Sequence, residues 1–145
     1  MFAEIEQKIV DRLRERLGPT VTVEPQRELE RVPQLRQKAP AAFVVYDGYS
    51  PGESIENVPS VQQIVLEWWV VVAARSARGA GESNDARDEA GALATLVAES
   101  LLGFHVGGGK YLRLSAAPGP EYDAGYCHIP LAFTCAVTMK ARTDT

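Results

Sequence analysis

The sequence has little of what several specialised protein classes require. In 145 residues it carries fewer basic than acidic residues, and its net charge of −4 argues against broad nucleic-acid binding, which normally needs a concentrated basic surface. The N-terminal stretch contains acids within its apolar pattern, so it lacks the apolar region of a signal peptide. The apolar run Ile64 to Ala74 is interrupted by Glu67 and is shorter than the roughly 20 residues that span a membrane. We therefore expect a cytosolic protein with no membrane contact.

Cysteine is also scarce. Cys127 and Cys135 are the two cysteines, and they lie on either side of the middle of the last expected strand. They are eight positions apart, and an extended segment of that length holds its ends about 26 Å apart, so the two cysteines cannot form a disulfide within that strand. The sequence predicts two buried or half-buried free thiols in a reducing compartment.

Motifs for chemistry are missing as well. The GGGK at Gly107 to Lys110 fails as a phosphate loop, because Phe104 stands where the first glycine belongs and Tyr111 replaces the hydroxyl residue that binds magnesium. His105 and His128 have no metal-site spacing, and each is expected at the surface or in a turn. No GxSxG elbow is present. We predict no catalytic residue, no metal site and no cofactor.

The remaining composition is that of an ordinary globular protein, with 46% hydrophobic and 23% charged residues. A chain of this length can bury a real core and fits one domain, which we assign to residues 1–145.

The fold is organised around Val61 to Arg75, VQQIVLEWWVVVAAR. Side chains alternate between the two faces of a strand, so Trp68 and Trp69 point to opposite sides of the sheet. Both sides are apolar from Ile64 onward, which is typical of a strand buried on two faces. The chain is too short to supply two layers of helices, so we expect helices on one face and a neighbouring subunit on the other.

Two helices are predicted. Apolar residues recur every three or four positions from Phe2 to Leu17, and Gly18-Pro19 then ends the helix. A second helix is expected from the N-cap candidates Ser83 to Asp85 up to about Leu102. Its buried stripe contains alanines, which indicates a close approach to the sheet.

Further strands alternate with these helices, so we predict an α+β fold: a two-layer sandwich with a mainly antiparallel sheet of four to five strands and helices on one face. Pro130 places the start of the last strand near an edge or a bulge. The other expected segments are a strand at 20–24 ended by Pro25, a short charged helix or irregular crossing at 28–37, a strand at 41–47, a long connection at 48–60, and strands at 110–115 and 129–140.

The long connection at 48–60 exceeds an ordinary hairpin loop, which takes about two to five residues. It carries Tyr49 and Ile55 among acidic and small residues. A flexible surface hairpin and an arm that reaches a partner both remain open.

The order of these segments resembles phage tail terminator proteins, with the Mu-type tail proteins nearest and the lambda minor tail protein U more distant. The similarity lies in the amphipathic helix opening at Met1, the RQKAPAAFVVYDGY strand, the long apolar strand, the alanine-rich helix ending in LLGF and the alternating last strand. It covers nearly the whole chain and is one of pattern and order.

The resemblance implies a structural protein, not an enzyme. It implies a homo-oligomeric ring, usually of six subunits, that caps the tail tube, ends its polymerisation and meets the head connector. Such a protein is assembled in the host cytoplasm, becomes part of the virion tail, and lets DNA pass through the ring without sequence recognition. A sheet apolar on both faces agrees with a partner.

Candidate residues follow from this picture. A charge at Trp68 or Trp69, whichever lies on the uncovered face, should weaken assembly while leaving the fold. The candidates for the oligomer interface are Trp68, Trp69, Val71, Tyr49 and Ile55, and those for the lumen are Arg75, Arg78 and Arg87, which are otherwise plain exposed arginines. The alternative is a small-molecule-binding or enzymatic α+β domain, possibly dimeric, which predicts a pocket with convergent polar groups.

Overall fold

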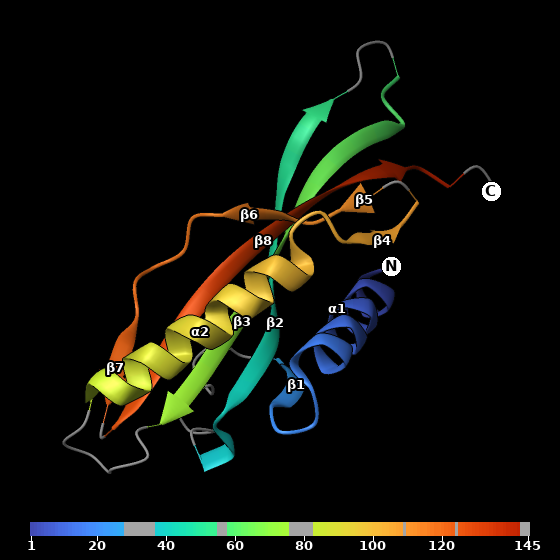
Figure 1. Ribbon diagram of the computed structural model, residues 1–145. Helices are drawn as coiled ribbons and strands as arrows, with labels where there is room; N and C mark the ends of the chain where they lie inside the picture. The colour runs from blue at the N-terminus through green and yellow to red at the C-terminus, as the bar shows by residue number, and fades with distance from the viewer. Residues whose placement is uncertain (28–36, 55–57, 76–82, 109, 124, 143–145) are drawn as a thin grey trace.

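The computed structural model describes residues 1–27, 37–54, 58–75, 83–108, 110–123 and 125–142 (Figure 1). The described helices are α1 (Phe2–Leu17) and α2 (Ser83–Leu101). The described strands are β1 (Thr22–Gln26), β2 (Ala41–Ser54), β3 (Val61–Arg75), β4 (His105–Gly107), β5 (Lys110–Tyr111), β6 (Arg113–Ser115), β7 (Glu121–Asp123) and β8 (Tyr126–Lys140).

Six of these strands form one sheet. Its order is β1-β2-β3-β8-β6, and β7 also pairs with β8, while β4 and β5 make a separate two-stranded sheet. The α+β prediction is confirmed, and so is the mainly antiparallel sheet. The sheet is nevertheless mixed, because β1 runs parallel to β2, and it has one strand more than the four to five expected. β6 was expected as the second half of a single strand at 110–115. β7 lies in the stretch between the expected strands 110–115 and 129–140, which we expected as a loop.

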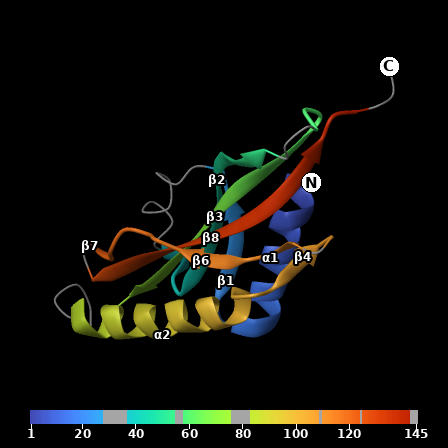
Figure 2. The same cartoon turned by 90° about the horizontal axis from the view of Figure 1, so that it is seen from above.

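Both helices lie on the same side of the sheet, as the two views together show (Figures 1 and 2). The 3.6-residue spacing of α1 buries Ile5, Ile9 and Leu13 against the sheet, as predicted. The same core takes Trp68 from β3 and Phe133 from β8, which face each other across the register. Within the described residues, no helix has the length and apolarity needed to cross a bilayer.

The alanines of α2 approach the sheet closely, as the sequence indicated. Ala86 and Ala90 are fully buried and cluster with Ala74 of β3 and Cys127 of β8. Because these side chains are small, the backbone of α2 can lie close to the sheet at the end of β3. This contact fixes where the rest of α2 lies.

The boundary of β1 was predicted wrongly. We expected Pro25 to end the strand, yet Pro25 lies inside β1, opposite Val44 of β2. β1 stands at the edge of the sheet and pairs on one side only. A proline, which has no N–H to donate, is tolerated in such an edge strand.

The connection expected at 48–60 is shorter than predicted. β2 continues to Ser54 and stays paired with β3, and it absorbs two irregularities, between Tyr46 and Tyr49 and between Pro51 and Ser54. Gly48 has a φ of 99°, a conformation that a glycine adopts without strain. Pairing with the long strand β3 therefore keeps this segment extended, although its Gly and Pro residues suggested a loop.

Pro130 behaves as expected. Along the outer edge of β8, β7 pairs with residues up to His128 and β6 with residues from Ala132 onward. Pro130 lies between these two pairings, where β3 alone pairs with β8. His128 contradicts its prediction, because it is 5% exposed instead of lying at the surface; His105 is exposed, as predicted.

Both cysteines are free and buried, which confirms the prediction for them. Burial raises the pKa of the Cys127 and Cys135 thiols above their ordinary value of 9.0. The native state then keeps thiol protons that the unfolded chain loses at high pH, so the free energy of unfolding should fall as the pH rises above about 9.

We expect a thiol-specific reagent at pH 7.5 to label neither cysteine of the native protein at an appreciable rate and to label both in urea. Labelling should be followed by absorbance, with urea melts at pH 7.5 and 10 as the second measurement. Native labelling as fast as that of the unfolded chain would contradict the buried placement.

Candidate functional site

The side of the sheet that faces away from the helices is the candidate interaction face, and we call it the second face. Pairing between β3 and β8 sets its rows, in which Trp69 lies beside Ala132 and Glu67 beside Thr134. Its members on the three long strands are Ala41, Phe43, Val45 and Ser50 of β2, Val61, Gln63, Val65, Glu67, Trp69, Val71, Ala73 and Arg75 of β3, and Tyr126, His128, Pro130, Ala132, Thr134, Ala136, Thr138 and Lys140 of β8. The short strands add Thr22, Glu24 and Gln26 of β1, Arg113 and Ser115 of β6, and Glu121 and Asp123 of β7.

Half of the second face is already buried within one chain. Phe43 and Ala73 are fully buried, and Val45 and Val71 are 2% and 5% exposed, in one cluster that also includes the partly buried Trp69. The expectation that a neighbouring subunit must cover this face is therefore wrong for this half. Val71, one of our interface candidates, offers a partner almost no surface.

Trp69 stands at the boundary of that buried half. Its indole Nε1 donates a hydrogen bond to the Oε1 of Glu67, at 3.2 Å, and its ring is partly buried. An aromatic ring with one apolar flank and a satisfied polar edge is a common anchor in protein interfaces. Trp69 is thus the strongest of the five interface candidates.

Trp68 lies on the helix side, as alternation along β3 requires. It is 1% exposed, and its ring centroid is 5.0 Å from that of Tyr46, which in turn lies 5.1 Å from Phe2 of α1. Its indole N–H is buried without a hydrogen-bond partner. A charge at Trp68 would enter the core, so the structure leaves Trp69 as the position where a charge tests assembly.

The other two interface candidates are elsewhere. Tyr49 is 65% exposed and lies beside Leu66 in the register, which puts it on the helix side of the sheet, opposite to Trp69. Ile55 lies outside the described residues. The interface candidates therefore do not gather into one patch.

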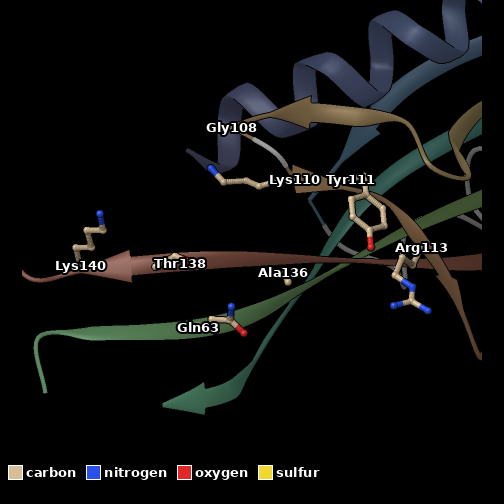
Figure 3. A pocket seen from close by; sticks show the side chains of 8 residues that line it. All are labelled: Gln63, Gly108, Lys110, Tyr111, Arg113, Ala136, Thr138 and Lys140. Atoms are coloured by element: carbon tan, nitrogen blue, oxygen red, sulfur yellow. The ribbon is translucent and has the colours of Figure 1, made fainter. Parts of the chain in front are cut away.

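The outer half of the second face is the end that holds Gln63 of β3 and Lys140 of β8. A groove lined with positive charge lies there (Figure 3). It has a volume of about 520 Å³, and its three charged lining residues are Lys110, Arg113 and Lys140. No carboxylate lines it, and none of the described residues forms an ion pair with these three cations. Its remaining lining residues are Gln63, Gly108, Tyr111, Ala136 and Thr138.

Three strands place these cations. Arg113 lies in β6 opposite Thr134 of β8, and Lys140 ends β8 six residues further on. Lys110 begins β5, directly after the turn from β4, where Gly107 and Gly108 have positive φ angles. Gly107 and Lys110 of the GGGK sequence are thus paired residues of two short antiparallel strands, and a strand instead of a helix begins at Lys110, which agrees with our rejection of a phosphate loop.

α1 supports this turn from the other side. The Nζ of Lys8 donates a hydrogen bond to the carbonyl oxygen of Val106, at 3.2 Å. A Cβ on Gly107 would lie 2.8 Å from that same Nζ, so the close contact requires glycine there or a shift of the lysine. The position of Lys110 is therefore tied to the helix layer.

The lumen candidates lie far from this groove. Arg75 is exposed at the end of β3, opposite Tyr126, and Arg87 is exposed on α2; Arg78 lies outside the described residues. Gln63 of the groove and Arg75 are separated by about 40 Å along the strand, at about 3.3 Å per residue. Arg75 thus lies at the opposite end of β3 from the groove.

Sequence analysis did not predict the groove, although it predicted the strands that line it. Alternation along the expected strands 110–115 and 129–140 puts Tyr111 and Arg113 on one face of the first strand and Lys140 on the polar face of the second. What the sequence did not show was the pairing of β6 with β8, which joins those two faces. A search for cations on the polar faces of the expected strands would have found Arg113 and Lys140, but not Lys110, which alternation places on the face opposite to Arg113.

The lining of the groove gives no catalytic arrangement. The lining residues that the structure describes include no imidazole, carboxylate or thiol that could act as a general base beside the Tyr111 and Thr138 hydroxyls. Within the described residues, no three His, Cys, Asp or Glu side chains gather into a group that could hold a metal ion. A pocket of polar groups does exist, as the alternative function predicted, yet its charge has a single sign.

Comparison with known proteins adds the family. No individual curated protein matches the chain. The family model described as "Phage tail terminator protein" matches residues 2–143, from the start of α1 to beyond the end of β8. The match spans all the strands of the sheet and both helices, so this chain belongs to the phage tail terminator family.

Proposed function

We propose that this protein forms a closed homo-oligomeric ring, most simply of six subunits, at the end of the tail tube. There it stops tube polymerisation and joins the tail to the head connector. It acts as a structural component of the virion tail, without catalysis, and is assembled in the host cytoplasm. The family match over residues 2–143 is the observation that carries this proposal.

The partners are then the neighbouring copies, the tail tube protein and the connector protein, with DNA passing through the ring without sequence recognition. A ring needs a contact between two different surfaces of the same molecule. The second face supports this requirement, because Trp69 remains partly exposed beside Glu67 at its centre. A neighbouring subunit that packs on Trp69 would bury the part of its ring that its own chain leaves exposed.

The size of the purified protein in solution tests the ring. Light scattering coupled to gel filtration should show a mass that rises with protein concentration and levels off at a whole-number multiple of the 15.8 kDa chain, as a closed ring requires. Electron microscopy of that species should show rings, and added tube protein should give shorter tubes. A strictly monomeric protein at high concentration, with no effect on tube length, would overturn the proposal.

Trp69→Glu should raise the dissociation constant of the assembly at least about tenfold, because it removes an aromatic anchor and introduces a charge beside Glu67. Its far-ultraviolet circular dichroism should be unchanged. Sedimentation velocity over a concentration series measures the effect.

Leu114→Glu is the matched control for fold and charge, since Leu114 is also exposed but lies on β6 beside Phe133, on the helix side of the sheet and away from Trp69. Trp69→Phe, which keeps an aromatic ring, should assemble nearly as well as the parent. Equal assembly of the parent and Trp69→Glu would exclude Trp69 from the contact.

A further inference from the structure

Among the described residues, none neutralises the charge of the groove at the outer half of the second face. Lys110, Arg113 and Lys140 carry like charges, and the chain as a whole has a net charge of −4. Cations held together without a carboxylate repel one another, and an anionic partner relieves that repulsion. The groove is therefore a binding surface for something negatively charged.

The size and exposure of the groove limit what that partner is. About 520 Å³ is far larger than a single phosphate needs, and both Arg113 and Lys140 are exposed instead of being buried around a small ion. Binding of duplex DNA depends on many phosphate contacts, which three cations on an acidic chain do not supply. An acidic protein surface fits these observations best.

Such a surface exists on this chain. The outer side of α2 carries the exposed acids Asp88, Glu89 and Glu99, together with Leu96, which is 49% exposed. Asp88 also lies 3.9 Å from the Nε of Arg87, in an exposed ion pair, whereas Glu89 and Glu99 form no ion pair with any of the described residues. Residues three and four apart lie on one side of a helix, so Glu89, Leu96 and Glu99 share one stripe. Tyr111 and Ala136 in the groove provide apolar contacts that Leu96 would meet.

The spacing of the charges also agrees. From Thr134, which lies beside Arg113, to Lys140 the strand rises about 20 Å, at about 3.3 Å per residue. From Asp88 to Glu99 the helix rises about 17 Å, at about 1.5 Å per residue. The acids of one helix can therefore face the cations of one groove along its whole length.

We infer that the groove of one copy receives the outer side of α2 from the next copy. The groove lies on the second face and α2 covers the first, so the contact joins two different surfaces, as a closed ring requires. This inference rests on the proposed ring and assigns its charged contact.

Two reversed variants test it. Lys110→Glu/Lys140→Glu makes the groove acidic, and Asp88→Lys/Glu99→Lys makes the helix stripe basic. Each variant alone should raise the dissociation constant of the assembly at least about tenfold, because like charges then face each other. Sedimentation velocity measures both, and assembly of the unmodified protein should weaken as salt is raised.

An equimolar mixture of the two variants gives the sharpest result. Each acidic groove can then face a basic helix, and each basic groove an acidic helix, so alternating rings should form at concentrations where neither variant assembles alone. Arg16→Glu/Arg27→Glu is the matched control for the groove variant, because it makes the same change in net charge as Lys110→Glu/Lys140→Glu at exposed residues outside both surfaces. Its assembly should equal that of the unmodified protein.

The outcomes separate the two proposals. Normal assembly of the groove variant would overturn this contact while leaving the ring intact, and failure of the mixture to assemble would overturn it as well. Binding of a fluorescent DNA duplex that only the groove variant loses, together with normal assembly, would identify DNA as the partner instead. A monomeric unmodified protein would overturn the ring itself.

Discussion

Trp68→Ala should lower the free energy of unfolding by about 3–5 kcal/mol, the range for removing a large aromatic side chain from a core. Trp68 is 1% exposed, contacts the ring of Tyr46, and faces Phe133 across the sheet. Removing it leaves a cavity between the sheet and the helices that these neighbours cannot fill. Urea unfolding followed by circular dichroism, at one fixed protein concentration, measures the loss.

The neighbouring tryptophan provides the control. Trp69→Ala should lower the free energy of unfolding by only about 1 kcal/mol, because its ring is partly buried and its hydrogen bond goes to the side chain of Glu67. Trp68→Phe should be milder than Trp68→Ala, since it keeps a ring and removes an indole N–H that has no partner. Equal losses for the two alanine variants would contradict the assignment of the faces.

The two tryptophans show what a sequence gives and where it stops. Alternation placed them on opposite faces of β3, and the structure confirms that separation. Which face the helices cover depends on how α1 and α2 dock, and that choice is made by contacts distant in sequence, such as Ile9 and Leu13 against the sheet. The pattern alone therefore left both tryptophans as interface candidates.

Long elements were predicted closely because their periodicity is strong. Phe2 to Leu17 and Val61 to Arg75 have the predicted bounds. The failures concern elements defined by their partners. β2 passes through Gly48 and Pro51 because β3 remains beside it. Alternation predicted the residues of β6 as the second half of a strand at 110–115, whereas β7 is a strand of three residues that pairs with β8 and that no local signal marks.

The candidate site was predicted less well than the fold for the same reason. The cationic groove joins residues from β5, β6 and β8 through pairings that leave no trace in spacing along the chain. The predicted need for a partner over the whole second face was too broad, since Phe43 and Val45 are already buried. The family resemblance came from the order of elements, and the family match over residues 2–143 agrees with it.

The approach of α2 to the sheet leads to the second large effect. Ala90 is fully buried, and it packs in a cluster of small residues with Ala74 and Cys127. Leucine at this position adds three carbon atoms to a site with no space, so either the helix moves outward or the side chains take strained rotamers. We expect Ala90→Leu to lower the free energy of unfolding by about 3 kcal/mol, at the upper end of the usual range for overpacking.

Ala92→Leu isolates packing from helix propensity. Ala92 is exposed on the same helix, and leucine is nearly as good a helix former as alanine, so this variant should change the free energy of unfolding by less than about 0.5 kcal/mol. Because the outward shift of α2 would also displace its acidic stripe, Ala90→Leu should assemble more weakly than the unmodified protein when both remain folded. Equal stability of the two variants would mean that α2 does not lie as low on the sheet as its alanines indicate.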